Sequence, residues 1–405
     1  MQTSHNIVTT LGTIPTPPDE KELLSRAYAF AATLRARSLE ISQARQVPED
    51  IMAELGRLGL LQLGRPARYG GRDVGMDAIF RIGRALASGD GSVAWVYCVS
   101  NSHDHLVGLY PAHVQDEYWA SPQPLCASSY MPSGNAAQVE NGWMVSGKWS
   151  FCSGIDFCGW IVIGAITVSA GETPQPELRL FLVKKSELTV IDDWHVMGLS
   201  GTGSKSVLID KVVIPNDRVL RNSDVMAGTT PGGAVHSNPL YQSSIWPLFG
   251  FSILAPVTGI ARGAIDFMVS QLRAKPGSSP ATFDAKLHST QQHLAEAGVL
   301  VDAAELLYER GLQETAALIQ ASKELSIDLR VRNRRDQAYL ASMCRKAVDI
   351  LMGMSGGRGI REEGAVQRAF RDIYAISAHP GGNWDVASAS YGSVLLGGPP
   401  TEMFQ

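Results

Sequence analysis

One stretch of the chain decides the fold, and it reads Gly147-Lys148-Trp149-Ser150-Phe151-Cys152-Ser153-Gly154-Ile155-Asp156-Phe157-Cys158-Gly159-Trp160-Ile161-Val162-Ile163-Gly164. Its aromatic and β-branched residues flank a Ser-Gly turn, which predicts two β-strands. Because side chains alternate along a strand, Trp149 and Phe151 are expected to share one face, and Lys148 and Ser150 the other. Alternating aromatic residues usually belong to the core of a sheet, but they can also offer a surface on which a ring stacks.

The composition indicates a globular protein with a large core. A chain of 405 residues that is 45% hydrophobic is expected to form two or three packed domains. The net charge of -4 provides no basic surface for nucleic acid. The five cysteines are an odd number, and Cys152 and Cys158 lack zinc-ligand spacing, so neither disulfides nor a metal site are expected. Without a signal peptide or an apolar run of about 20 residues, a cytoplasmic protein with no membrane partner is expected.

The period of the apolar residues changes along the chain. Helical spacing predicts helices at about 19–41, from 48 onward, at 76–87 and at 92–109. Short β-rich runs follow at 125–130, 137–151, 159–168, 178–183, 188–191 and 205–213. Helical patterns then cover 245–273, 281–313, 315–354 and 365–378. We therefore predict an α+β, mostly α chain with an N-terminal helical domain (1–122), a middle antiparallel β barrel (123–227) and a C-terminal helical bundle (228–405).

Three further motifs accompany the stretch at 147–164. They are a Ser-rich segment at 126–134, a Gly-rich run at 194–204, and a helix that leads to Gln271-Leu272-Arg273. Each alone has an ordinary explanation as a turn, a hairpin or a helix end. With these motifs in this order, the chain resembles proteins of the acyl-CoA dehydrogenase fold over nearly its whole length. The resemblance is strongest to the flavin-dependent monooxygenases that have this fold. The resemblance implies an N-terminal helical domain, a middle β barrel and a C-terminal four-helix bundle, assembled as a homotetramer.

The resemblance also implies a flavin site. Phe151 and Ser153 would lie against the ring, with Ser153 near its reactive nitrogen, and the Ser-rich segment would contact the pyrimidine edge. Arg273 would reach the phosphate side, often across a subunit boundary, although a solvated arginine at a helix end is an open alternative. The predicted cofactor-binding residues are Ser128, Trp149, Phe151, Ser153, Thr202, Gly203, Ser204, Arg273, Gln291 and Gly357.

A histidine distinguishes between the enzyme classes of this fold. After an Arg-Asp pair, acyl-CoA dehydrogenases carry a glutamate that removes the α-proton of the substrate. Here the corresponding segment, 377–384, contains no glutamate and holds His379 instead. The resemblance implies His379 as the base that activates the substrate, with His103 and Ser129 positioning it. His105 competes with His103, because residues two apart cannot share a helix face.

We therefore predict the oxygenase component of a two-component flavin-dependent monooxygenase. Reduced FMN or FAD from a separate NAD(P)H-flavin reductase would react with O2 to form a flavin 4a-hydroperoxide, which hydroxylates an aromatic substrate (a phenol, polyketide or indole-like ring). One alternative is a dehydrogenase that oxidises an acyl thioester, and another is a catalytically inactive scaffold of the same fold. The sequence leaves open the substrate, oxygenation at carbon, nitrogen or sulfur, and the choice between FMN and FAD.

Overall fold

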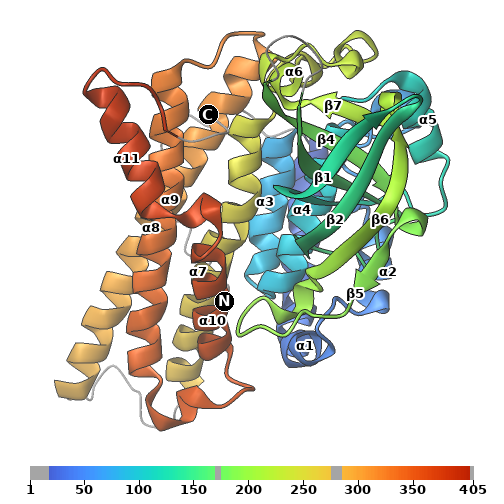
Figure 1. Ribbon diagram of the computed structural model, residues 1–405. Helices are drawn as coiled ribbons and strands as arrows, with labels where there is room; N and C mark the ends of the chain where they lie inside the picture. The colour runs from blue at the N-terminus through green and yellow to red at the C-terminus, as the bar shows by residue number, and fades with distance from the viewer. Residues whose placement is uncertain (1–17, 169–174, 275–284, 402–405) are drawn as a thin grey trace.

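The computed structural model describes residues 18–168, 175–274 and 285–401. Figure 1 shows a sheet on one side, a bundle of helices from the second half of the chain on the other, and helices of the first half between them. The first helices are α1 (Pro18–Ala44), α2 (Glu49–Arg57), α3 (Met76–Ala87), α4 (Gly91–Val107) and α5 (Ala112–Trp119). The predicted helices are confirmed to within a few residues, whereas α5 was not predicted.

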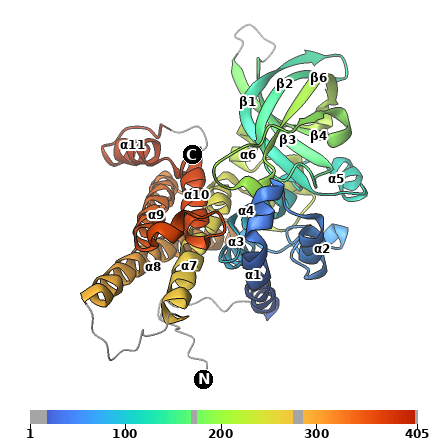
Figure 2. The same cartoon turned by 90° about the horizontal axis from the view of Figure 1, so that it is seen from below.

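Helix α4 lies at the centre of the molecule and is buried along nearly its whole length. The carboxylate of Asp90 caps its beginning by accepting a hydrogen bond of 3.0 Å from the N–H of Val93. The helix packs against β1 of the sheet and against α7 of the bundle. Seen from below in Figure 2, the sheet and the bundle are joined through these first helices. Side chains of α4 can therefore reach both layers.

The middle of the chain forms a seven-stranded sheet in the order β5-β6-β2-β1-β3-β4-β7. The strands are β1 (Cys126–Val139), β2 (Gly142–Cys152), β3 (Trp160–Val168), β4 (Pro176–Lys184), β5 (Thr189–Ile191), β6 (Lys205–Pro215) and β7 (Val219–Arg221). Strands β1 and β3 run parallel, and the other pairs are antiparallel. Among the described residues, the edge strands β5 and β7 do not pair. The described residues therefore form an open, mixed sheet with short edge strands, and the closed antiparallel barrel of the prediction is not seen in them.

Residues 147–164 form the end of β2, a turn and the beginning of β3. Trp149 is completely buried, and its indole N–H donates to the carbonyl of Gly164 at 2.8 Å. Phe151 is 70% exposed and has a φ of +63°. The pairing of β2 with β6 shifts register between Trp149 and Cys152. This irregularity turns Phe151 outward, so the prediction that Trp149 and Phe151 share a face is wrong.

The second half of the chain is helical. After α6 (Asn222–Ala227), it forms α7 (Trp246–Ala274), α8 (Ala285–Gln320), α9 (Ile327–Met354), α10 (Ala365–Ser377) and α11 (Trp384–Leu395). Helices α7 to α10 pack against one another, and α11 packs on α9. The predicted break near residue 314 is wrong, since α8 continues through the buried Thr315, whose hydroxyl bonds to the Gly311 carbonyl within the helix. Helix α7 is apolar and long enough to cross a membrane, but 78% of its most apolar window is buried inside the protein, as in a core helix.

Candidate active site

A chain of hydroxyl groups lies where the sheet meets α4. The Ser153 hydroxyl is 2.8 Å from that of Ser204, which is 2.7 Å from that of Thr202. The indole N–H of Trp95, on α4, donates to Ser153 at 3.0 Å. The structure thus brings three of the predicted cofactor residues together and adds Trp95. In the sequence, Trp95 was marked only as an indole on a helix expected to be buried.

The Gly-rich loop before β6 is packed between helices. A Cβ on Gly198 would lie 2.1 Å from the carbonyl oxygen of Arg371, and one on Gly201 would lie 2.4 Å from Ile41. Thr202, Gly203 and Ser204 are buried. The small residues of this loop therefore permit close approach of α1 and α10. Thr202 and Ser204 reach the site through Ser153, which is the most exposed of the three hydroxyl residues.

His379 follows α10, at the start of the short helix η8 (Pro380–Gly382). Its Nδ1 accepts a hydrogen bond of 3.0 Å from the N–H of Gly381, so the neutral ring carries its hydrogen on Nε2. The guanidinium of Arg334 donates to the carbonyls of Pro380 and Gly381 at 2.6 and 2.5 Å and holds this turn. His379 is exposed as a whole residue, but the protein atoms packed around its ring partly desolvate the imidazole. This desolvation, together with the charge of Arg334, lowers the pKa of His379 to about 4. His379 therefore presents a donor, and the base role predicted for it would need the other tautomer.

His103 faces the sheet from α4 and is buried. Its Nδ1 lies 2.6 Å from the carbonyl oxygen of Cys126, and its Nε2 lies 3.0 Å from the hydroxyl of Ser128. A carbonyl can only accept, so Nδ1 carries the hydrogen and Nε2 accepts a hydrogen bond from Ser128. Burial lowers the pKa of His103 to about 4, so the ring is neutral at pH 7.

The neighbours of His103 differ from those expected. His105 lies on another face of α4, where its ring is 5.9 Å from that of Tyr241. The hydroxyl of Ser129 donates to the carbonyl of Ser150 at 2.9 Å. The structure therefore places His103 rather than His105 beside the sheet, and it pairs His103 with Ser128 rather than with Ser129.

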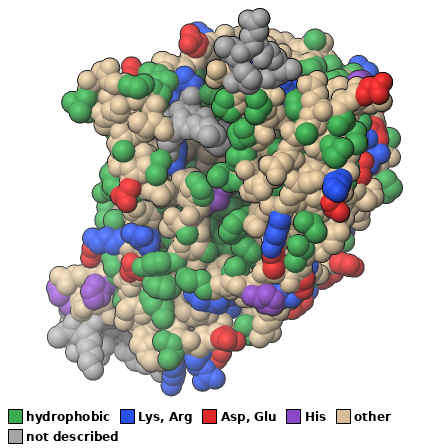
Figure 3. Space-filling model, viewed as in Figure 1, with side chains coloured by type: hydrophobic (Ala, Val, Ile, Leu, Met, Phe, Trp, Pro, Cys, Tyr) green, Lys and Arg blue, Asp and Glu red, His purple; other side chains and the backbone are tan. Residues whose placement is uncertain are grey.

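Aromatic side chains form a wall between the two histidines. The ring of Phe249, on α7, lies 6.1 Å from that of His103 and 5.5 Å from that of Trp246. Tyr130, on β1, lies 5.2 Å from Trp246. One turn after Phe249, Ile253 packs so closely on Gly381 that a Cβ there would lie 1.9 Å from its Cδ1. One face of α7 therefore extends from His103 toward the turn that holds His379. Figure 3 shows the surface hollowed between the sheet and the bundle, with a histidine visible inside the hollow.

The aromatic residues predicted to bind flavin have different surroundings. Phe151 projects from the sheet, and its ring meets that of Trp194 edge to face at 5.9 Å. Trp149 lies wholly inside the sheet and has no surface to offer a ring. Phe151 therefore exposes its ring to solvent, whereas the side chain of Trp149 is inaccessible to a ligand.

Three other predicted cofactor residues lie at the far end of the bundle. Arg273, Gln291 and Gly357 are all exposed. They stand at the end of α7, near the beginning of α8 and just after α9, which meet at the lower end of the bundle in Figure 1. Arg273 follows Phe249 by 24 residues, which is about 36 Å along a helix. Within one chain, these residues are therefore far from Ser153, at the opposite end of α7 from Phe249.

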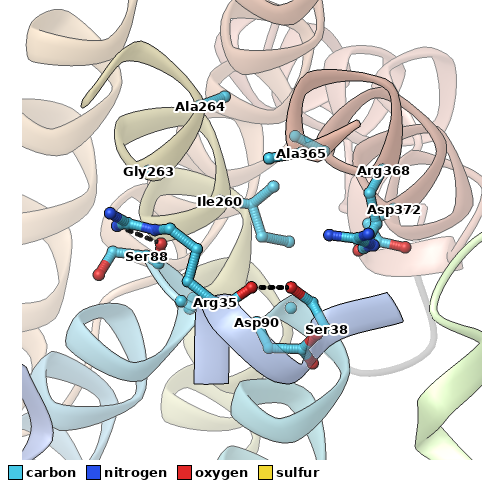
Figure 4. A pocket seen from close by; sticks show the side chains of 14 residues that line it. Arg35, Ser38, Ser88, Asp90, Ile260, Gly263, Ala264, Ala365, Arg368 and Asp372 are labelled. Atoms are coloured by element: carbon cyan, nitrogen blue, oxygen red, sulfur yellow. Dashed lines mark hydrogen bonds between the residues drawn. The ribbon is translucent and has the colours of Figure 1, made fainter. Parts of the chain in front are cut away.

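A small polar cavity of about 40 Å³ lies between α1, the α3–α4 turn, α7 and α10 (Figure 4). Asp90, Arg368 and Asp372 line it. Burial, with the nearby charge of Asp372, raises the pKa of Asp90 to about 7, and burial raises that of Asp372 to about 6. Burial also lowers the pKa of Arg368. A cavity of this size has room for a few water molecules and is too small for an aromatic substrate.

The described residues offer no disulfide and no cluster of metal ligands. All five cysteines are buried and free of disulfides. Within the described residues, no three His, Cys, Asp or Glu side chains are grouped so that they could hold a metal ion.

Comparison with known proteins identifies the family of the chain. Residues 17–117 match the family model described as acyl-CoA dehydrogenase, N-terminal domain, and residues 251–384 match the C-terminal domain of the same family. The oxygenase component of the FADH(2)-dependent resorcinol hydroxylase of Rhizobium sp. (strain MTP-10005) is 30% identical over 95% of this chain and 97% of its own. The oxygenase subunit HsaA of Rhodococcus jostii (strain RHA1), a flavin-dependent monooxygenase, is 29% identical over 94% of this chain and 99% of its own.

A solved structure leads to the same family. The crystal structure of the HsaA monooxygenase from M. tuberculosis superposes with a TM-score of 0.88 at 28% identity, covering 95% of this chain and 100% of that one. Two family models, a curated relative over almost the full length and a solved structure therefore agree. The chain belongs to the acyl-CoA dehydrogenase family and, within it, to the oxygenase components of flavin-dependent monooxygenases.

Proposed function

We propose that this chain is the oxygenase component of a two-component system that hydroxylates an aromatic substrate, either a phenol, a polyketide or an indole-like ring. Reduced FMN or FAD arrives from a separate NAD(P)H-flavin reductase and, when bound, supplies the activation of O2. The names of the relatives support this reaction class, since one is a resorcinol hydroxylase and another an indole-3-acetate monooxygenase.

One observation carries the proposal, which is that Trp95 connects the two ends of the site. Its indole N–H donates to Ser153 at 3.0 Å, and its ring meets that of His379 edge to face at 5.8 Å. The serine expected beside the flavin and the histidine that stands in place of a dehydrogenase glutamate therefore share one side chain. These two contacts support a single reaction space with a hydrogen-bonding group on each side.

The residues around this space fit a reduced flavin. The exposed ring of Phe151 can stack on a flat ring system, and the oxygen of Ser153 can accept a hydrogen bond at its edge, whereas Ser128, predicted as a cofactor residue, is assigned to the substrate. The Nε2–H of His379 can donate to an oxygen atom that carries partial negative charge. The aromatic wall of Tyr130, Trp246 and Phe249 excludes water from the space where a substrate ring would lie.

A proton relay explains how a phenol would be activated. The hydroxyl of Ser128 donates to Nε2 of His103. Because burial lowers the pKa of His103, the proton transfer would accompany the attack of the ring: a phenol that donates to the Ser128 oxygen would pass its proton to Ser128 while Ser128 passes its own proton to His103. Electron density then moves from the phenolic oxygen into the ring, which makes the ring a stronger nucleophile. We assign the base role to His103 acting through Ser128, and a donor role to His379. Ser129 supports the pairing of the strands.

The alternative reaction is oxidation of an acyl thioester, as in the dehydrogenases of this family. That reaction needs a base for the α-proton of the substrate. The segment 377–384 contains no glutamate, and His379 presents a donor at this place. An assay with acyl-CoA substrates and an electron-acceptor dye separates the two reactions, and we expect no reduction of the dye.

The proposal includes a homotetrameric assembly in the cytoplasm, without nucleic acid or a membrane. Exposed apolar residues on the bundle support an assembly through its helices; they include Val299, Leu306, Tyr339, Leu395 and Leu396. Arg273, Gln291 and Gly357 would then serve the flavin phosphate of a neighbouring copy. The domain limits at residues 122 and 227 stay a prediction.

The experiment combines the purified protein with a flavin reductase, NADH, FMN or FAD, and a panel of phenols and indoles. Hydroxylated product and released peroxide are measured separately. We expect His103→Gln and Ser128→Ala to lower hydroxylation of a neutral phenol by about 100-fold. The loss should be much smaller with a phenol that is already ionised at the assay pH, because no proton then has to be removed.

The matched control is His113→Ala, because His113 is a surface histidine bonded to Asp217. It should hydroxylate like the unaltered protein. Equal losses with neutral and ionised phenols would disprove the relay. Absence of hydroxylated product from the whole panel, with reduced flavin present, would count against the proposed reaction.

A further inference from the structure

The hydroxyl chain has a single direction, which follows from the groups at its two ends. The carbonyl of Leu199 can only accept, and it receives the Thr202 hydroxyl hydrogen at 2.8 Å. Thr202 therefore accepts from Ser204, and Ser204, having given its only hydrogen to Thr202, accepts from Ser153. At the other end, the indole of Trp95 can only donate, and it donates to Ser153. Every hydrogen bond of the chain therefore points the same way, from the donor Trp95 through Ser153, Ser204 and Thr202 to the acceptor Leu199.

This direction has a consequence for Ser153. Its only hydrogen is given to Ser204, within the protein, and one lone pair of its oxygen receives the indole N–H. What remains available to a bound molecule is the other lone pair. Ser153 therefore acts toward a ligand as an acceptor.

The two oxidation states of a flavin differ at this point. The reactive nitrogen of a reduced flavin carries a hydrogen and donates, whereas the same nitrogen of an oxidised flavin has a bare lone pair and accepts. We propose that Thr202 and Ser204 are positioning residues that hold Ser153 as an acceptor, so that the site favours reduced over oxidised flavin. The inference rests on the proposed function, which places Ser153 beside that nitrogen.

The test measures dissociation constants for oxidised FMN and, without oxygen, for reduced FMN. Ser204→Ala removes the acceptor of the Ser153 hydrogen. Thr202→Val leaves the hydrogen of Ser204 free to turn toward Ser153. In both variants Ser153 can donate to oxidised flavin. We expect the ratio of the oxidised to the reduced dissociation constant to fall about three- to tenfold, mainly through tighter binding of oxidised FMN.

Two variants separate this effect from a general disturbance. Thr202→Ser keeps the hydroxyl and should restore the ratio of the unaltered protein. Ser206→Ala removes a buried hydroxyl that bonds to Ser150 outside the chain and should leave the ratio unchanged. Thermal unfolding confirms that each variant is folded, and the mild Thr202→Val substitution keeps the test valid if Ser204→Ala does not fold.

Ser153→Ala distinguishes this inference from the proposed function. If Ser153→Ala changes the ratio while Thr202→Val and Ser204→Ala leave it unchanged, Ser153 contacts the flavin but the chain does not set its role, and the inference is overturned alone. If Ser153→Ala changes neither dissociation constant, Ser153 is not beside the reactive nitrogen. The inference then fails together with that part of the proposed function.

Discussion

The carboxylate of Asp372 accepts a hydrogen bond of 2.6 Å from the backbone N–H of Leu199, a residue 173 positions earlier in the chain. Asp372 stands on α10, the helix that leads to His379. Leu199 provides the carbonyl at which the hydroxyl chain ends. This bond therefore joins the two halves of the candidate active site across the boundary between the sheet and the bundle.

Replacement of Asp372 should loosen this connection. Asp372→Ala leaves a buried backbone N–H without its partner, so we expect a loss of about 1–3 kcal/mol in the free energy of unfolding, together with weaker binding of reduced flavin. Asp372→Asn keeps an oxygen acceptor and should lose much less. Urea unfolding and anaerobic flavin titration measure the two effects. Equal stability of the two variants would show that the bond to Leu199 does not matter.

Asp90 should make stability depend on pH. Its pKa is about 7 in the folded protein, against an ordinary 3.8, so between these values the folded state keeps a proton that the unfolded state has lost. Its contribution to stability is present at low pH and is lost as the pH rises toward 7. In Asp90→Asn the side chain does not titrate, so the decrease in unfolding free energy with rising pH is absent, and the asparagine oxygen can still cap α4. We expect the variant to gain on the order of 2–4 kcal/mol relative to the unaltered protein between pH 4 and pH 8.

The measurement for Asp90 is urea unfolding at a series of pH values. Asp385→Asn, at the exposed beginning of α11, is the control because it is also an acid in the first turn of a helix. A difference between Asp90→Asn and the unaltered protein that stays constant with pH would contradict the prediction.

Substitution of Phe151 should weaken flavin binding and leave stability nearly unchanged, whereas substitution of Trp149 should lower stability. Phe151→Gly relieves a left-handed backbone conformation, worth about 1–2 kcal/mol, at a comparable cost in chain entropy, so stability should change by less than about 1 kcal/mol. Loss of ring stacking should weaken binding of reduced flavin by about three- to tenfold. Trp149→Ala should instead cost about 3–5 kcal/mol in unfolding free energy, because the side chain is completely buried. Unchanged flavin affinity in Phe151→Gly would remove Phe151 from the site.

If Arg273 binds the flavin phosphate, its loss should weaken binding of FMN and not of riboflavin, which has no phosphate. Arg273→Gln is expected to weaken binding of FMN by about tenfold or more, since a charge-assisted bond is lost, and to leave binding of riboflavin unchanged. Calorimetry with both ligands measures the difference. Arg361→Gln, an exposed arginine at the same end of the bundle, is the control. Equal weakening for both ligands, or for neither, would exclude a contact between Arg273 and the phosphate.

Local patterns predicted some elements well and failed at others. Helix α3 begins and ends at the predicted residues, Met76 and Ala87, because its apolar period is regular. Closure of the sheet could not be predicted, since it depends on whether β5 and β7 meet. The outward turn of Phe151 likewise depends on how β2 pairs with β6, which the alternation of residues within β2 does not reveal.

By itself, the sequence determined the order of helices and strands, the family, and a set of candidate residues that includes Ser153, His103 and His379. It could do so because periodicity, turn residues and motif order lie in short stretches of chain. Only the tertiary structure decided that Ser128 and not Ser129 bonds to His103, that His379 presents a donor, and that Trp95 and Leu199 direct the hydroxyl chain. These properties arise from hydrogen bonds whose direction depends on which groups meet, and most of those groups are brought together from distant parts of the chain.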